Sequence, residues 1–257
     1  MPERLLDAPG LWRMDTFLVP QGALSSGDVV LQGAEGHHAA DVMRVADGQL
    51  IRLVDGCGAE AIGRVDSVGR SEVAANVLEA RDHSREDGAR LTVAQALLKG
   101  RAFDDVVRRC GELGVESIVP ITTARSIGRV PAGGERGRLS RWESVALAAL
   151  KQSRGVFLPT IEPVMDLSAV ARLGGDVELP IVAWEEGGVP LSTALRSHTG
   201  RILLIVGPEG GLTEAEVGIL TDAGFVAVSL GRRVLRADWA AAAAAAMIAS
   251  EVGGLLP

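Results

Sequence analysis

Residues that are able to do chemistry gather in two glycine-containing stretches near the C-terminus. The first, "IVGPEGGLTEAEV" (205–217), places the carboxylate of Glu209 in a turn whose glycines allow a backbone to approach a ligand closely. The second, "SLGRRVLRADWA" (229–240), combines three arginines with Asp238. Carboxylates accept protons, and arginines stabilise developing negative charge, so both stretches carry groups that catalysis requires. Because the two stretches lie one strand–helix unit apart, we expect them to face one pocket.

The first stretch does not have the pattern of a phosphate-binding loop. It lacks the sequence G-x-x-x-x-G-K-[ST], and its glycines do not follow G-x-G-x-x-G. Glu209 would also repel an anion. A neutral turn with acidic groups favours a cationic or zwitterionic adenosine cofactor, and the alternative is a tight strand-to-helix turn that binds nothing.

The elements around these stretches alternate between strand and helix. The apolar run "RILLIVG" predicts a central strand, and Thr213 followed by Glu216 predicts a capping box that starts a helix at about Glu214. The run Ala240 to Ala246 predicts a second, smooth helix. From Leu91 onward the alternation predicts an α/β fold with a parallel sheet, in which ligands bind at the carboxyl ends of the strands.

The preceding part of the chain has a different pattern. From Asp28 to Leu78, short apolar or alternating runs are separated by turns that contain glycine and aspartate, which predicts a small β-rich domain. The segment 80–90 is polar and predicts a linker. The domains are therefore expected at 1–79 and 91–257, and residues 1–12 receive no functional interpretation.

Composition restricts the class of protein. With 257 residues, of which 47% are hydrophobic, the chain is long enough to bury a sizeable core. Charged residues near the start (Glu3, Arg4 and Asp7) argue against a secretory signal, and no later run reaches about 18 apolar residues, so we expect a cytoplasmic protein without membrane contact. Cys57 and Cys110 lack metal-ligand spacing, so neither a disulfide nor a metal site is expected. The net charge of -7 argues weakly against general nucleic-acid binding.

The two stretches together, "LLIVGPEGGLTEAEV" and "VSLGRRVLRADWAAAAA", resemble the SPOUT class of methyltransferases. Within that class they resemble the ribosomal RNA small subunit methyltransferase E family, which methylates N3 of a specific uridine in 16S ribosomal RNA. The segments "HHAADVMRV" and "RLVDGCG" resemble its N-terminal PUA-like, RNA-binding β-barrel domain, while "LLKGRAFDDVVRRCGELGVESIVPITTARS" and "RWESVALAALKQSRGVFLP" resemble its catalytic domain. The resemblance covers about residue 28 to residue 256.

The resemblance implies a C-terminal α/β domain tied in a trefoil knot, which binds S-adenosylmethionine. It also implies a homodimer that acts on 16S ribosomal RNA in assembled small subunits. Carried over position by position, the first cofactor loop comprises Ile205, Val206, Gly207, Pro208, Glu209, Gly210 and Gly211. The second comprises Leu230, Gly231, Val234, Leu235, Arg236 and Ala240, and a third strand end contributes Trp184 and Glu185.

Methylation at uracil N3 requires the N3 proton to leave. Arg236 is our first choice for stabilising the resulting negative charge, with Arg232 or Arg233 second. A carboxylate base, Glu209 or Asp238, is the competing assignment. Candidate RNA-binding residues are basic or histidine side chains, namely Arg13, His38, Arg44, Lys99, Arg125 and Arg154, with Lys151 as a further cation.

The chain departs from the family pattern in one motif. Where the family usually has L-R-x-E-T-A, this chain has Asp238 for the glutamate and Trp239 for the threonine. Two alternatives follow: another SPOUT enzyme that acts on a ribose 2'-hydroxyl or on transfer RNA, and an RNA-binding homologue whose site has decayed because of Trp239.

Overall fold

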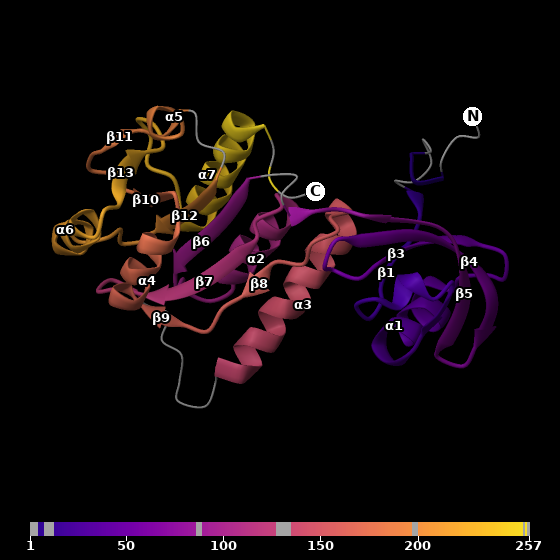
Figure 1. The fold of residues 1–257 in the computed structure, drawn as a ribbon. Helices are drawn as coiled ribbons and strands as arrows, with labels where there is room; N and C mark the ends of the chain where they lie inside the picture. Colours follow the sequence, from indigo (N-terminus) through magenta and orange to yellow (C-terminus); the bar gives the residue numbers. More distant parts are fainter. Residues whose placement is uncertain are drawn as a thin grey trace. The chain divides into compact units, whose positions relative to one another are not determined.

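The computed structural model describes residues 5–7, 13–85, 89–126, 135–196, 200–253 and 255. The chain divides into two compact units (Figure 1). The first contains the residues up to Arg85 together with Leu150–Leu158, and the second contains residues 86–149 and 159–257.

The first unit is built on a five-stranded sheet in the order β1-β3-β4-β5-β2. Its elements are η1 (Leu5–Asp7), β1 (Thr16–Leu18), η3 (Ala23–Ser25), β2 (Asp28–Leu31), α1 (Gly33–His37), the π-helix η4 (His38–Met43), β3 (Leu50–Val54), β4 (Ala59–Gly69) and β5 (Glu72–Asp82). Only β1 and β3 pair in parallel, and the remaining neighbours are antiparallel. Two shifts of register along β4 and β5 bend these long strands, as β-bulges do. The bent sheet encloses a core that includes Phe17, Ile51 and Leu53.

A segment distant in sequence completes this unit. The backbone N–H of Gly58 donates to the carbonyl of Val156 at 3.1 Å, and the N–H of Leu158 donates to the carbonyl of Gly56 at 2.8 Å. These bonds attach the turn after helix α3 (Glu135–Ser153) to the β-rich unit. The division therefore differs from the predicted boundaries of 1–79, 80–90 and 91–257, and β5 also extends to Asp82, inside the segment predicted as a linker.

The second unit contains an eight-stranded parallel sheet in the order β11-β13-β10-β12-β6-β7-β8, with β9 beside β7. Its strands are β6 (Arg90–Ala96), β7 (Ser117–Thr122), β8 (Thr160–Ile161), β9 (Met165–Asp166), β10 (Leu179–Ala183), β11 (Val189–Pro190), β12 (Arg201–Val206) and β13 (Val226–Ser229). The other elements are α2 (Ala102–Glu112), most of α3, α4 (Leu167–Leu173), η6 (Gly174–Asp176), α5 (Leu191–Ala194), α6 (Glu214–Asp222) and α7 (Ala237–Val252). The predicted α/β fold with a parallel sheet is confirmed.

The central strand is β12, between β10 and β6. Every residue of β12 after Arg201 is buried, which explains its continuous apolar run, because a strand inside a parallel sheet has both faces covered. Val206 lies beside Ala183 of β10 and Gln95 of β6 in the sheet register. The carboxyl ends of β6, β10 and β12 therefore lie side by side at one edge of the sheet, which is where the sequence predicts the pocket.

Two helices begin at this edge as predicted. Helix α6 starts at Glu214 with a capping box: the Thr213 hydroxyl accepts from the Glu216 N–H at 3.2 Å, and the Glu216 carboxylate accepts from the Thr213 N–H at 2.8 Å. Helix α7 contains the alanine run, begins after Arg236 and packs against α2. None of the described helices combines the length and apolar character needed to cross a membrane.

Candidate active site

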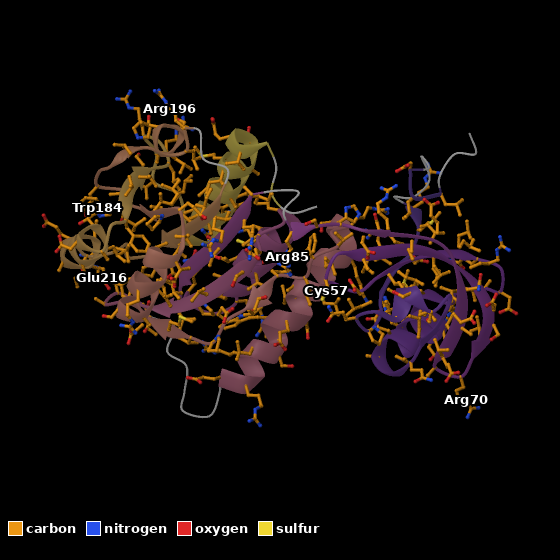
Figure 2. All side chains as sticks on the ribbon, viewed as in Figure 1. Cys57, Arg70, Arg85, Trp184, Arg196 and Glu216 are labelled. Carbon is orange, nitrogen blue, oxygen red and sulfur yellow. The ribbon has the colours of Figure 1, made fainter. Side chains whose placement is uncertain are left out.

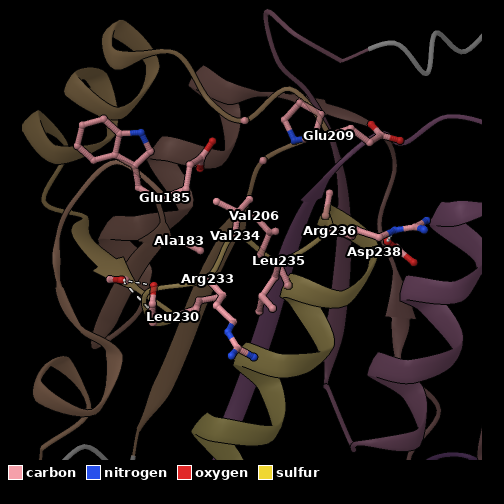
Figure 3. A pocket seen from close by; sticks show the side chains of 18 of the residues that line it. Ala183, Glu185, Val206, Glu209, Leu230, Arg233, Val234, Leu235, Arg236 and Asp238 are labelled. Carbon is pink, nitrogen blue, oxygen red and sulfur yellow. Dashed lines mark hydrogen bonds and ion pairs between the residues drawn. The ribbon is translucent and has the colours of Figure 1, made fainter.

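A cavity of about 430 Å³ lies at the carboxyl edge of the parallel sheet, within the second unit (Figure 3). Its walls come from the segments that follow β6, β10, β12 and β13 and from the first turn of α7. The lining residues are Leu98, Ala102, Ala183, Trp184, Glu185, Val206, Gly207, Pro208, Glu209, Gly211, Ser229, Leu230, Gly231, Arg232, Arg233, Val234, Leu235, Arg236, Ala237, Asp238 and Ala240. Figure 3 shows Glu185 on one side and Arg236 with Asp238 on the other.

The structure brings together nearly all residues predicted for the cofactor, with two exceptions. Ile205 is fully buried in the core of the second unit, because side chains alternate along a strand and Val206 takes the position that faces the cavity. Gly210 is not part of the wall, and its carbonyl accepts a hydrogen bond from Nη1 of Arg125 at 2.8 Å. All predicted catalytic candidates, Arg232, Arg233, Arg236, Glu209 and Asp238, line the cavity.

The turn after β12 requires glycine at a specific place. The N–H of Gly211 donates to the carbonyl of Pro208 at 2.9 Å, which closes a β-turn. Gly211 has φ +69°, and a Cβ there would stand 2.0 Å from Oε1 of Glu185. The absence of a side chain at Gly211 therefore makes room for the Glu185 carboxylate at the wall of the cavity.

The side chain of Gln95 holds the start of this turn by hydrogen bonds. Gln95 was not among the predicted site residues. Its side chain is fully buried, and Nε2 donates to the carbonyls of Gly207 at 3.0 Å and Ala96 at 3.1 Å, with a longer bond to Val206 at 3.4 Å. The available signal was a single amide residue in the otherwise apolar end of "TVAQALL". A buried polar group is stabilised by such bonds, so Gln95 fixes the start of the turn.

Two candidate RNA-binding residues contact the same turn. The backbone N–H of Lys99 donates to Oε1 of Glu209 at 3.1 Å, and the Lys99 side chain is exposed. Arg125 holds the Gly210 carbonyl, and the neighbouring Ala124 N–H donates to Oε1 of Glu216 at 2.7 Å. The segments after β6 and β7 thus hold the turn through its residues Glu209 and Gly210.

At the other end of the cavity, one carboxylate joins two arginines. Nε of Arg236 donates to Oδ1 of Asp238 at 3.1 Å. Nη1 of Arg109, on α2, donates to Oδ2 of Asp238 at 3.3 Å and to its carbonyl at 2.7 Å. The Asp238 side chain is only 9% exposed, whereas that of Arg236 is 80% exposed. Arg109 was not selected from the sequence, where an arginine on an amphipathic helix gives no specific signal.

Trp239 does not belong to the cavity wall. Its side chain is 53% exposed, and the guanidinium carbon of Arg109 lies 4.2 Å from the centroid of its ring. The indole therefore leaves the cavity open. This geometry removes the physical basis for a pocket closed by Trp239.

The remaining RNA-binding candidates belong to the first unit. The rings of His38 and Phe17 pack in a T-shaped arrangement with centroids 6.0 Å apart, while Arg13 and Arg44 are exposed. Burial, followed by the neighbouring charge of Arg52, lowers the pKa of Arg154. Lys151 forms a half-buried ion pair, with Nζ 2.6 Å from Oε1 and 2.8 Å from Oε2 of Glu35, so its charge is already balanced inside the unit.

Cysteines and metal ligands make no further site in the part of the chain that the structure describes. No group of three or more His, Cys, Asp or Glu side chains there is arranged to hold a metal ion. Cys57 is exposed (Figure 2) and Cys110 is buried, and both are free thiols. Burial raises the pKa of Cys110 to about 12, which makes this thiol unreactive near neutral pH.

Known proteins resemble the chain over most of its length. Residues 31–78 match the model of the RNA methyltransferase PUA domain, and residues 85–249 match that of the RNA methyltransferase domain. The ribosomal RNA small subunit methyltransferase E of Mycobacterium bovis is 34% identical over 219 residues, which cover 84% of this chain and 83% of the relative. The chain belongs to this methyltransferase family. The predicted resemblance and the N-terminal PUA-like domain are thereby confirmed.

Two further members of the methyltransferase E family support the assignment. The Bacillus subtilis protein is 31% identical over 217 residues, which cover 82% of this chain and 85% of the relative. The solved structure of the Neisseria gonorrhoeae protein, bound to S-adenosylmethionine, aligns with a TM-score of 0.81 and 28% identity, covering 92% of this chain and 97% of that one. As a member of the family, the protein is an RNA methyltransferase.

Proposed function

We propose that the protein transfers a methyl group from S-adenosylmethionine to N3 of a specific uridine in 16S ribosomal RNA of the small subunit. The observation that carries the proposal is a cavity in which the Glu185–Gly211 wall faces the Arg236–Asp238 pair (Figure 3), in a member of the methyltransferase E family. The relative from Neisseria gonorrhoeae, which binds S-adenosylmethionine, supports the choice of cofactor.

The cavity suits such a cofactor in size and chemistry. Its volume of about 430 Å³ lies in the range of about 300–1,000 Å³ that is typical of small-molecule sites. The carboxylates of Glu185 and Glu209 suit a ligand that carries positive charge, while Val206, Leu230 and Val234 provide apolar wall for an adenine ring. When bound, S-adenosylmethionine supplies an electrophilic methyl group on a sulfonium.

Arg236 is placed to stabilise negative charge on the uracil. Its Nε is held by Asp238, while Nη1 and Nη2 form no hydrogen bond with the described residues. These two groups are therefore available to an oxygen of the uracil as N3 loses its proton, in the manner of an oxyanion hole. Arg232 and Arg233 line the same loop and are the second candidates for this role.

Glu209 is the proton acceptor that this geometry favours. Both carboxylate oxygens of Asp238 accept hydrogen bonds from arginines, whereas Glu209 uses only Oε1, toward the Lys99 N–H, among the described residues. Glu209 is also exposed at the cavity, so a substrate has access to it. A positioned base with a free oxygen meets the first requirement for proton removal.

The finer features implied by the family remain part of the proposal. They are the SPOUT trefoil knot in the second unit, a cytoplasmic location, a homodimer, and RNA contacts by Arg13, His38, Arg44, Lys99, Arg125 and Arg154. Exposed apolar side chains at the cavity and on α7, namely Val234, Leu235, Trp239 and Met247, support a dimer, because a partner copy would cover them.

The test is a methylation assay with purified protein, S-adenosylmethionine labelled in the methyl group, and small subunits that lack the modification. Digestion to nucleosides and mass analysis should identify N3-methyluridine, and Arg236→Ala should lower its rate of formation about 10²- to 10³-fold, as expected for loss of a charge-stabilising donor. Arg172→Ala, an exposed arginine on α4 outside the cavity, is the matched control. A methylated ribose or transfer RNA product would replace the substrate assignment, and failure to bind S-adenosylhomocysteine would instead favour the decayed homologue.

A further inference from the structure

Arg109 has contacts that the proposed mechanism does not use. It lies near the end of α2, and its side chain is only 21% exposed. Its guanidinium donates to the side chain and the backbone carbonyl of Asp238, and it stacks on Trp239. A largely buried guanidinium with three such contacts restricts the positions of the groups that it contacts, because charge-assisted hydrogen bonds are strong.

We propose that Arg109 is a positioning residue for methyl transfer, which acts on Arg236 through Asp238. The inference rests on the proposed function, because it assumes that Arg236 contacts the uracil. Arg109 itself does not line the cavity, so its effect would reach the substrate only through this relay.

The first step of the relay is the carboxylate of Asp238. Arg109 binds Oδ2 and Arg236 binds Oδ1, so the two arginines hold opposite oxygens of one buried group. With Nε of Arg236 occupied in this way, only its Nη groups remain to face a ligand. Without Arg109, Asp238 would be free to rotate, and the Nε contact would no longer define the direction of the Arg236 side chain.

The second step is the backbone of α7. The bond from Nη1 of Arg109 to the Asp238 carbonyl, at 2.7 Å, ties the first turn of α7 to α2. Arg236 is the N-cap residue of α7, so the position of this turn determines where the Arg236 side chain begins. Arg109 therefore determines both the backbone position of Arg236 and the direction of its side chain.

Trp239 keeps Arg109 in this position. The indole lies over the guanidinium at 4.2 Å and screens one of its faces from water, and a cation–π contact of this kind is favourable. Asp238 and Trp239 thus act together, because adjacent residues of α7 supply the carboxylate and the aromatic face that Arg109 needs. The group of two arginines and one carboxylate also carries net positive charge, which favours an anionic uracil.

The test compares Arg109→Ala and Arg109→Lys with Arg108→Ala. Arg108 is the adjacent arginine on α2, pairs with Asp105 on the surface and lies outside the cavity, so it is a matched control. We expect Arg109→Ala to lower kcat about 10- to 100-fold, because displacement of a catalytic group by about 1 Å has effects of this size. The affinity for S-adenosylhomocysteine and the KM for small subunits should be unchanged. Lysine lacks the planar fork, so it should restore activity only in part.

A double substitution separates positioning from a general structural role. If Arg109 acts through Arg236, Arg109→Ala should cause no further loss of kcat in an Arg236→Ala background. Independent, multiplicative losses would overturn the inference, as would wild-type kcat in Arg109→Ala. If the alanine variant does not fold, Arg109→Lys and Trp239→Phe provide the same comparison. Failure of the proposed function is recognised separately, by an absence of N3-methyluridine with the unmodified protein or by full activity of Arg236→Ala alone.

Discussion

Oε1 of Glu185 lies only 2.0 Å from the position that a Cβ would take on Gly211. Glu185 follows β10 and Gly211 belongs to the turn after β12. These two walls of the cavity can approach so closely only because Gly211 has no side chain. Gly211 also has a left-handed backbone, with φ +69°. A side chain at position 211 would therefore be disfavoured twice, by the left-handed backbone and by the clash with Glu185. Relief of the clash would require either the turn or the Glu185 carboxylate to move.

Gly211→Ala should therefore impair both stability and cofactor binding. The left-handed conformation costs an L-residue about 1–2 kcal/mol, which should appear as a lower free energy of unfolding. The Glu185 side chain is flexible at its end, so we expect it to swing away from the new methyl group. If Glu185 binds a cationic part of the cofactor, affinity for S-adenosylhomocysteine should fall about tenfold or more, as measured by isothermal titration calorimetry.

Gly218→Ala is the matched control for this substitution. Gly218 lies within α6, and nothing stands within 4 Å of the Cβ that it would gain. Alanine is the better helix former by about 0.5–1 kcal/mol, so the control should be slightly more stable and bind the cofactor normally. Unchanged affinity in Gly211→Ala would show that the Glu185 carboxylate does not contact the cofactor.

Glu216 should make stability depend on pH in the acid range. Burial raises the pKa of Glu216, but hydrogen bonds from the N–H groups of Ala124 and Thr213 outweigh it and hold the pKa below its ordinary value of 4.5. The stabilisation is thus complete above that value and is lost as the pH falls through the lower pKa of the folded state. Glu216→Gln should lose about 1–3 kcal/mol at neutral pH, because it weakens hydrogen bonds to a charged group.

Urea unfolding at a series of pH values measures this effect. Between about pH 6 and pH 3 the wild-type protein should lose more stability than Glu216→Gln, since only the wild type protonates this carboxylate. Glu214→Gln removes a charge from the same helical turn without removing those bonds and should keep the wild-type slope. Parallel curves for wild type and Glu216→Gln would contradict the assignment.

Local sequence patterns predicted the elements of this site well, and contacts between distant residues were not predictable. The Thr213–Glu216 capping box spans one helical turn, so its residue types and spacing suffice. By contrast, Gln95 and Gly207 are separated by 112 positions, and Arg109 and Asp238 by 129. No periodicity within one element encodes such a pair. The family motif correctly selected the loops that form the cavity, but not the buried side chains that hold them.

Tertiary contacts also explain two places where the structure differs from the sequence prediction, Ile205 and the boundary of the first unit. Ile205 belongs to the motif but lies in the core, because alternation along β12 gives the cavity to its neighbour Val206. The turn after α3 joins the first unit through backbone bonds to Gly56 and Gly58, and backbone groups leave no trace in a side-chain pattern. Sequence thus identified the segments that line the cavity, while tertiary packing decided which of their residues face it.

The proton acceptor can be tested by comparing Glu209→Gln with Asp238→Asn. Glu209→Gln removes the carboxylate that retains a free oxygen, so kcat should fall about 10²- to 10⁴-fold, as expected for loss of a general base. Its activity should rise with pH, because hydroxide then replaces the missing base. Asp238→Asn should also lower kcat, since it weakens the hold on Arg236, but a rise in pH should not restore its activity, because the base is still present. The reverse pattern would assign the base to Asp238.

Thiol reactivity should distinguish the two cysteines and report whether α2 stays packed in the core. Cys57 is exposed, whereas Cys110 is buried with a pKa of about 12, and only a thiolate reacts rapidly with disulfide reagents. In the folded protein at about pH 8 one thiol should react, and both should react in denaturant. Cys57→Ser should abolish the fast reaction. Because Cys110 follows Arg109 on α2, its protection in Arg109→Ala would show that α2 stays folded, so an unfolded helix would not account for the loss of activity.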